Sequence, residues 1–168
     1  MEYWDLYDAE RQALGRTIQR GKQKRAGEYH QVVSIWVINS KGEILLTLRD
    51  PNKVICPDKW ENTGGSVLAG ETSRQGAVRE LREETGIVAS EYELILLGTL
   101  QEESAFVDTY LLKRDLPIEH IVLQEGETVD AKWVTPQMLE NMIADLSLAE
   151  PIGLRLYPIR DTFLSHLT

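Results

Sequence analysis

The sequence predicts an α+β fold in which a mixed β-sheet has helices packed on it. Early β-rich segments are joined by a short turn, which indicates a hairpin, and later β-rich segments alternate with a few helical patterns. The 168 residues are 42% hydrophobic, which is enough for a sizeable core. No repeat, low-complexity tract or evident linker divides the chain, so we expect residues 1–168 to form a single domain.

The N-terminal part holds the segments expected to form the hairpin. Residues 4–8 alternate loosely and predict a short edge strand within an N-terminal extension of residues 1–30. Residues 31–39, QVVSIWVIN, are rich in β-branched and aromatic side chains and predict a buried strand. Residues 39–42 carry a turn signal, and EILLTLRD at 43–50 is the returning strand.

The rest of the chain alternates between helical and extended patterns. We expect a loop at 51–60, a helix at 72–85, strands at 93–100, 106–112 and 132–134, and helices at 136–146 and 154–166. Thr72 and Gln75 have the spacing of a capping box, and Gly86 supplies a C-terminal stop for the same helix. Thr135 is a good N-cap residue, with proline at the first helical position.

Charge and composition exclude several classes of protein. The net charge of −9 disfavours binding to nucleic-acid duplexes, although a bound cation could still recruit a small phosphorylated ligand. There is no apolar run of membrane-spanning length and no secretory signal pattern, which argues against a membrane protein. The single cysteine, Cys56, cannot form an internal disulfide, so we expect a cytoplasmic protein.

Residues 15–28, GRTIQRGKQKRAGE, are rich in Lys and Arg and hold a single acid, Glu28. This segment has two interpretations. It can be a solvated connection, or it can be a basic rim that receives an anionic substrate.

The helix expected at 72–85 carries three glutamates close together. Glu80, Glu83 and Glu84 share an arc about 100° wide, adjacent to the core-facing side that holds Ala77, Val78, Leu81 and Thr85. Like charges at this spacing cost roughly 0.2–0.5 kcal/mol per pair, and carboxylates in the last turn also oppose the helix dipole. Two interpretations remain: an exposed acidic face, or a site for a hard divalent cation such as Mg²⁺, which prefers oxygen ligands.

A glycine-rich stretch, TGGSVLAGE at 63–71, comes directly before this helix and permits close approach of a ligand. Residues 65–87 combine it with the glutamates in one fixed pattern: Gly65, Glu71, Arg79-Glu80-Leu81, Glu83-Glu84 and Gly86-Ile87. Each of these positions matches the Nudix box in type and spacing. The chain therefore resembles the Nudix, or MutT-like, hydrolase family.

The resemblance implies an α/β/α arrangement, with the box as a loop-helix-loop, and a pyrophosphohydrolase. Such enzymes use Mg²⁺ or Mn²⁺ to hydrolyse a diphosphate linkage in a nucleoside diphosphate joined to another group. It implies that Glu80, Glu83 and Glu84 hold the metal, with a carbonyl of Gly64 or Gly65, and that Glu80 can also be the base. Arg79 would orient Glu83, and Glu71 would tie the loop together. Relatives are commonly homodimers.

Many members of the family draw a further acid from outside the box. The candidates are Glu102, Glu103, Glu125 and Glu127, of which we prefer Glu127 because it shortly precedes a Trp-Val strand. Arg49 and Lys53 are candidates to meet phosphate, and Trp60 to stack on a base. Ordinary solvent-facing charge and core packing are the alternatives for these three.

Residues 29–50 and the stretch KWENTGG resemble the branch that contains isopentenyl diphosphate isomerases. Those isomerases place a catalytic cysteine near the end of the strand before the box, followed by a histidine. Here Cys56 lies earlier, in the loop, and His30 lies well before it, so the isomerase site is expected to be absent. Isomerase activity and nucleotide sensing without cleavage remain the alternatives to hydrolysis.

Overall fold

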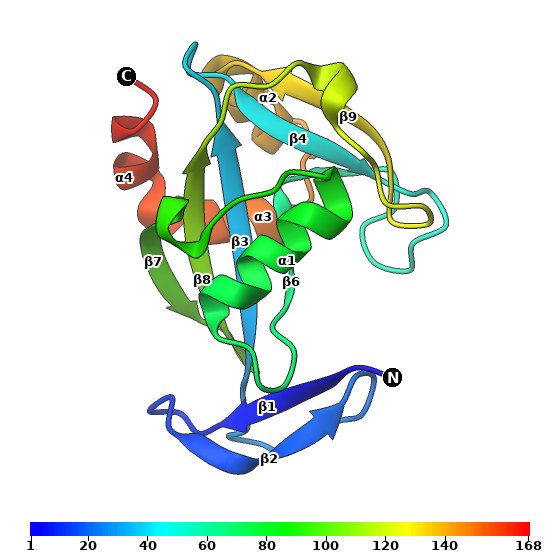
Figure 1. Cartoon of the computed structure of the whole chain (residues 1–168), viewed down its shortest axis with the longest axis vertical. Helices are drawn as coiled ribbons and strands as arrows, with labels where there is room; N and C mark the ends of the chain where they lie inside the picture. Colours follow the sequence, from blue (N-terminus) through cyan, green and yellow to red (C-terminus); the bar gives the residue numbers. More distant parts are fainter.

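The computed structural model describes residues 1–168 and holds two β-sheets (Figure 1). In the larger sheet the strand order is β5-β4-β3-β8-β7, β6 pairs with β3 and β9 pairs with β4. β3 and β8 run parallel and the other pairs antiparallel, so the sheet is mixed, as predicted. Its strands are β3 (His30–Ile38), β4 (Ile44–Arg49), β5 (Trp60–Glu61), β6 (Thr63–Ser66), β7 (Ile95–Gln101), β8 (Ala105–Lys113) and β9 (Thr128–Val134).

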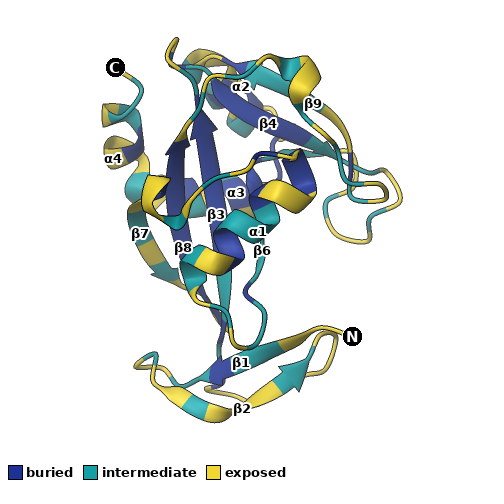
Figure 2. Ribbon diagram, in the orientation of Figure 1, coloured by how far each residue is buried: buried dark blue, intermediate teal, exposed yellow.

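Helices cover both faces of the larger sheet, which confirms the α/β/α prediction. Val33, Ile35 and Val37 of β3 pack in a cluster with Ala77 and Leu81 of helix α1 (Ser73–Thr85). The alternating neighbours in β3 point to a second cluster that includes buried residues of three C-terminal helices. These helices are α2 (Pro136–Ala144), α3 (Glu150–Leu156) and α4 (Arg160–Ser165). Figure 2 shows β3, β4 and β8 buried between the helical layers.

The hairpin predicted between β3 and β4 forms, but the two strands separate almost at once. The only paired residues in their register are Ile38 and Ile44, next to the turn. Beyond that point β3 pairs with β6, while β4 pairs with β5 and β9. The divergence is visible in Figure 1, where α1 crosses the sheet beside the gap. It gives the Nudix-box residues a place between two branches of the same sheet.

The N-terminal residues form a separate two-stranded sheet, β1 (Tyr3–Tyr7) and β2 (Ala13–Gln19). The strand predicted at 4–8 therefore exists, but its partner is β2, and the start of the basic segment 15–28 is strand rather than a solvated connection. Several contacts tie this hairpin to the rest, including backbone hydrogen bonds between Tyr7 and Tyr29. Trp4 stacks on His30 at 4.1 Å between ring centroids, Arg11 donates to Asp108 at 2.8 Å, and the Gly70 amide donates to Asp5 at 2.8 Å.

Other differences from the sequence prediction lie in short elements. β5 and β6 occupy stretches predicted as loop, because two to four residues carry too little periodicity to reveal a strand. The helix predicted at 154–166 is interrupted by a 3₁₀ turn, Tyr157–Ile159, because Pro158 has no N–H to donate within a helix. No helix is both long enough and apolar enough to cross a membrane.

Candidate active site

Helix α1 presents its glutamates because both of its ends are fixed. The Thr72 side chain accepts from the Gln75 amide and Gln75 reciprocates, so the predicted capping box is present. Gly86 ends the helix at φ 74°, a left-handed conformation that glycine adopts without strain. With Ala77 and Leu81 completely buried against the sheet, the helix cannot rotate, and Glu80, Glu83 and Glu84 face one side.

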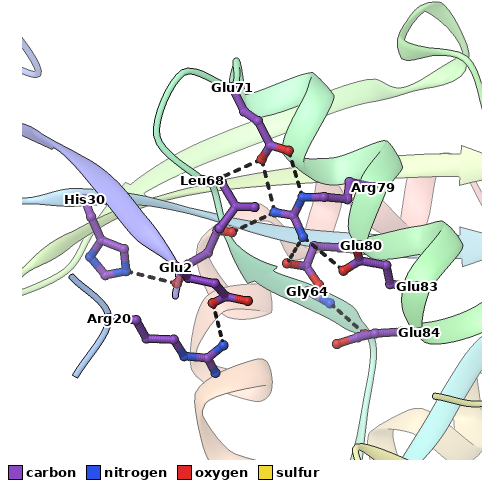
Figure 3. Close-up of polar contacts among 11 residues, drawn as sticks. Glu2, Arg20, His30, Gly64, Leu68, Glu71, Arg79, Glu80, Glu83 and Glu84 are labelled. Carbon is purple, nitrogen blue, oxygen red and sulfur yellow. Dashed lines mark hydrogen bonds and ion pairs between the residues drawn. The ribbon is translucent and has the colours of Figure 1, made fainter. Parts of the chain in front are cut away.

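The glutamates open into a cleft of about 240 Å³ that has no hydrophobic lining residue. Four segments contribute: the N-terminal hairpin, the end of β4 with its following loop, the Nudix-box residues, and the loop before β9. Figure 3 shows the hairpin and the glutamate-bearing helix facing each other across it. The lining residues are Glu2, Arg20, Arg49, Lys53, Gly64, Gly65, Arg79, Glu80, Glu83, Glu84, Gln124 and Glu127.

Arg79 connects the acids of the loop and the helix (Figure 3). It donates from Nε to Glu71 at 2.8 Å, and from one terminal nitrogen to Glu80 at 2.8 Å and to Glu83 at 3.1 Å. Its other terminal nitrogen reaches the Ser66 carbonyl at 3.0 Å. Burial alone would lower the pKa of Arg79, but hydrogen bonds to Glu71 and Glu80 raise it above the ordinary value. In the absence of metal, this arginine carries much of the charge compensation.

Arg79 makes no hydrogen bond to Glu84, so the charge of Glu84 is little compensated. Its residue is only 8% exposed, and its single hydrogen bond comes from the Gly64 amide at 3.4 Å. Burial, followed by the charges of Glu61 and Glu80, raises the pKa of Glu84 well above the usual range. Burial also raises the pKa of Glu80, although Arg79 opposes the shift. The alternative of a solvated acidic face therefore does not describe Glu84.

The donor set matches a hard divalent cation in chemistry, although the carboxylates do not converge on one point. No group of three or more His, Cys, Asp or Glu side chains is arranged around a common centre. The reason is visible in the contacts, since Arg79 holds Glu80 and Glu83 while Glu84 turns to Gly64. All available donors are oxygens, which Mg²⁺ and Mn²⁺ prefer. Holding such an ion requires Glu80 and Glu83 to turn from Arg79 toward Glu84.

Gly65 makes room for the Glu80 carboxylate. A Cβ atom at this position would lie 2.8 Å from Glu80 Oε2, closer than real contacts allow. Gly76, in the middle of α1, makes room for the loop before the helix, because a Cβ atom there would lie 3.1 Å from Val67 Cγ2. The loop is further fixed by Glu71, which accepts from the Leu68 amide at 3.0 Å.

Of the four candidates for an extra acid, the structure brings only Glu127 to the cleft, where it pairs with Lys53. Glu102 instead pairs with Arg155 at 2.7 Å, and neither Glu103 nor Glu125 lines the cleft.

Arg49 lines the cleft but is already engaged. It contacts Glu61 at 2.8 Å and donates to the carbonyls of Ile55 and Cys56, which holds the loop after β4 in place. Trp60 is not among the lining residues, and the Lys132 ammonium lies 4.0 Å from the centre of its ring. The structure therefore gives no support to stacking of a base on Trp60.

Comparison with known proteins decides the family. The model of the NUDIX domain matches residues 28–152, most of the chain. The chain belongs to the Nudix hydrolase family. It is similar to an uncharacterised Nudix hydrolase of Listeria monocytogenes, 36% identical over 148 residues that cover 84% of this chain and 85% of the relative.

Two further matches extend the comparison. A CTP pyrophosphohydrolase of Escherichia coli is 36% identical over 101 residues, 60% of this Nudix hydrolase and 73% of the relative. A crystal structure from Deinococcus radiodurans superimposes with a TM-score of 0.71 at 25% identity, covering 86% of this chain and 90% of that one. The relatives support an enzyme that hydrolyses nucleoside diphosphate derivatives, in a family that generally uses divalent metal ions.

Glu2 and Glu61 of this Nudix hydrolase were missed by sequence reasoning. Glu2 reaches the cleft, together with Arg20 of the predicted basic segment, because the N-terminal hairpin docks beside it, which no local pattern reveals. Glu61 does not line the cleft, but its charge acts on Glu84, and burial raises the pKa of Glu61 even though Arg49 opposes the shift. Its place directly before the glycine-rich stretch was the one available signal. Cys56 does not line the cleft.

Proposed function

We propose that this Nudix hydrolase uses Mg²⁺ or Mn²⁺ to cleave a diphosphate linkage in a nucleoside diphosphate joined to another group. One observation carries the proposal: Glu84 is a buried carboxylate without a cationic partner, beside Glu80, in an entirely polar cleft. A buried carboxylate costs free energy unless it is paired or coordinates a metal. We assign the metal to Glu80, Glu83 and Glu84, and propose that Gly65, which lines the same cleft, contributes its carbonyl oxygen.

When bound, the metal neutralises phosphate charge and lowers the pKa of a water molecule. In our proposal Glu80 accepts the proton of the water that attacks phosphorus, and the bond from phosphorus to the bridging oxygen breaks. Without metal, Arg79 donates to the Glu80 carboxylate at 2.8 Å, and Glu80 leaves this hydrogen bond when it turns to bind the metal. Glu127, which lines the same cleft from the loop before β9, positions Lys53 or accepts the proton in place of Glu80.

We further propose that Lys53 and Arg49 contact the phosphates of the substrate. Both line the cleft, and Lys53 can exchange Glu127 for a phosphate oxygen more easily than Arg49 can leave Glu61 and two carbonyls. Contact of Trp60 with a base stays a prediction. A cytoplasmic location and a homodimer also stay predictions, which fractionation of cells and sizing of the protein in solution would check.

The test is a panel of nucleoside diphosphate derivatives and nucleoside triphosphates, incubated with Mg²⁺ or Mn²⁺ and resolved by mass spectrometry. The wild-type enzyme should convert at least one compound, and Glu83→Gln and Glu84→Gln should abolish turnover. Glu125→Gln is the matched control, because this exposed acid does not line the cleft. Unchanged turnover in both cleft variants would refute the proposal.

Two further outcomes separate the alternatives. Tight binding of a nucleotide with no hydrolysis across the panel would favour a sensing domain. Isopentenyl diphosphate should give no isomer, since the cleft contains no cysteine or histidine.

A further inference from the structure

The basic segment 15–28 sends a single side chain into the cleft, that of Arg20. Its other cations are used or directed elsewhere. Arg16 pairs with the buried Glu28, and Lys24 lies 2.9 Å from Nδ1 of His30, beneath the hairpin. Lys22 is exposed and does not line the cleft. The predicted basic rim is therefore reduced to one guanidinium.

Arg20 is the most available of the four cations in the cleft. Its side chain is 62% exposed, compared with 17% for Arg49 and Arg79 and 22% for Lys53. Its one partner is Glu2, at 2.7 Å, and that carboxylate is itself 46% exposed. An exposed pair of this kind contributes roughly 0–1 kcal/mol, so an incoming anion can displace Glu2 at little cost. Arg49 and Arg79 would have to abandon several hydrogen bonds each.

The position of Arg20 is fixed by the fold of the hairpin. Arg20 follows the last residue of β2, and its amide donates to the Glu2 carbonyl at 2.9 Å. The hairpin is anchored at its other end by the pair between Arg11 and the buried Asp108. In Figure 3 Glu2 lies between Arg20 and the glutamates of α1, so the guanidinium stands on the wall opposite the proposed metal site.

We propose that Arg20 binds an anionic group of the substrate that lies beyond the cleaved diphosphate. In the free enzyme Glu2 pairs with Arg20, and the anionic group replaces Glu2 when substrate binds. This inference rests on the proposed function and narrows its substrate class. Nucleotides with an additional phosphate, such as nucleoside triphosphates, are favoured over nucleoside diphosphates joined to a neutral sugar. A guanidinium suits this task because its planar donors match two phosphate oxygens at once.

The experiment measures binding by calorimetry, with two ligands that cannot be cleaved because methylene groups replace their bridging oxygens. One is a nucleoside triphosphate analogue and the other a nucleoside diphosphate sugar analogue, both in the presence of Mg²⁺. Arg20→Gln should weaken binding of the triphosphate analogue about tenfold and binding of the sugar analogue much less. Lys22→Gln is the matched control, because it removes the same charge two residues away and should change neither affinity.

Glu2→Gln supplies a test of opposite sign. It frees Arg20 and removes a negative charge from the cleft, so the triphosphate analogue should bind more tightly. Equal effects of Arg20→Gln and Lys22→Gln, or equal losses for both ligands, would overturn the inference. The proposed function fails separately, if the wild-type enzyme hydrolyses no compound of the panel.

Discussion

The adjacent glycines Gly64 and Gly65 each leave no room for a Cβ atom, but for different reasons. At Gly64 an added Cβ would lie 2.6 Å from the Val33 carbonyl oxygen, which belongs to the backbone of β3 and cannot move away. At Gly65 it would instead meet the carboxylate of Glu80, which is the end of a flexible side chain. Gly64 therefore allows β6 to approach β3, and Gly65 leaves room for the carboxylate of Glu80, a proposed metal ligand.

We therefore predict a separation of effects between Gly64→Ala and Gly65→Ala. Gly64→Ala should destabilise the fold by about 1–3 kcal/mol, because the new methyl group overpacks the sheet. Gly65→Ala should change stability little but lower kcat by about 100-fold, because it displaces Glu80. Urea unfolding and steady-state kinetics on both variants check this. Equal loss of stability in the two variants would contradict it.

A second prediction concerns the guanidinium of Arg79. Its fork contacts Glu71, Glu80, Glu83 and the Ser66 carbonyl together, which a lysine ammonium cannot do. Arg79→Lys should therefore lower kcat by about 10–100-fold while the charge is kept. Single-turnover kinetics measure the chemical step directly. Full activity in Arg79→Lys would show that the charge alone matters.

The residues that the sequence could reveal are those whose relationship is local. Glu80, Glu83 and Glu84 share a helix, so their common face follows from helical periodicity. Glu61 approaches Glu84 only through the pairing of β5 with β4, and Glu2 and Arg20 only through docking of the N-terminal hairpin. Those contacts depend on long-range pairing, which cannot be read from local patterns in a single sequence.

Among the elements, the N-terminal hairpin has a docking contact, at His30, whose stability we expect to depend on pH. His30 lies under Trp4, with the Lys24 ammonium 2.9 Å from its Nδ1. Burial first, and then the charge of Lys24, lowers the pKa of His30 to about 4. The unfolded chain takes up this proton near pH 6.5, so between the two pKa values it binds more protons than the folded chain.

Stability should consequently fall as the pH is lowered from 6.5 toward 4, by at most about 3 kcal/mol from this group. The free energy of unfolding, measured in urea at pH 5, 6 and 7, shows the slope. His30→Gln cannot titrate and serves as the control, with a flatter dependence over the same range. The same slope in both proteins would mean that other groups are responsible.

Long elements with end signals were predictable, and short or interrupted ones were not. α1 has its capping box and its terminal glycine in the sequence, and β3 has its run of β-branched residues. β5 and β6 exist because β4 and β3 offer free edges to them, which is a property of the sheet. The break between α3 and α4 was signalled by Pro158, which the prediction of one continuous helix overlooked.

At the scale of the whole molecule, the cleft is assembled from four separate parts of the chain and carries more acids than cations. Five glutamates line it, namely Glu2, Glu80, Glu83, Glu84 and Glu127, against Arg20, Arg49, Lys53 and Arg79. The fold supports this arrangement by burying Ala77 and Leu81 of α1 against the sheet. We therefore expect the excess of carboxylates at the proposed metal site to lower the stability of the metal-free protein, and bound metal to restore it.

The melting temperature of the wild type and of Glu84→Gln, with and without Mg²⁺, shows whether metal compensates the buried charge of Glu84. Metal that binds only the folded chain raises the melting temperature of the wild type by mass action. Glu84→Gln removes a buried charge that faces Glu61 and Glu80, so without metal it should melt higher than the wild type, by about 2–4 °C for each kcal/mol gained. It should then show no further rise with Mg²⁺. A variant that melts lower than the wild type without metal and still responds fully to Mg²⁺ would show that Glu84 is not an uncompensated metal ligand.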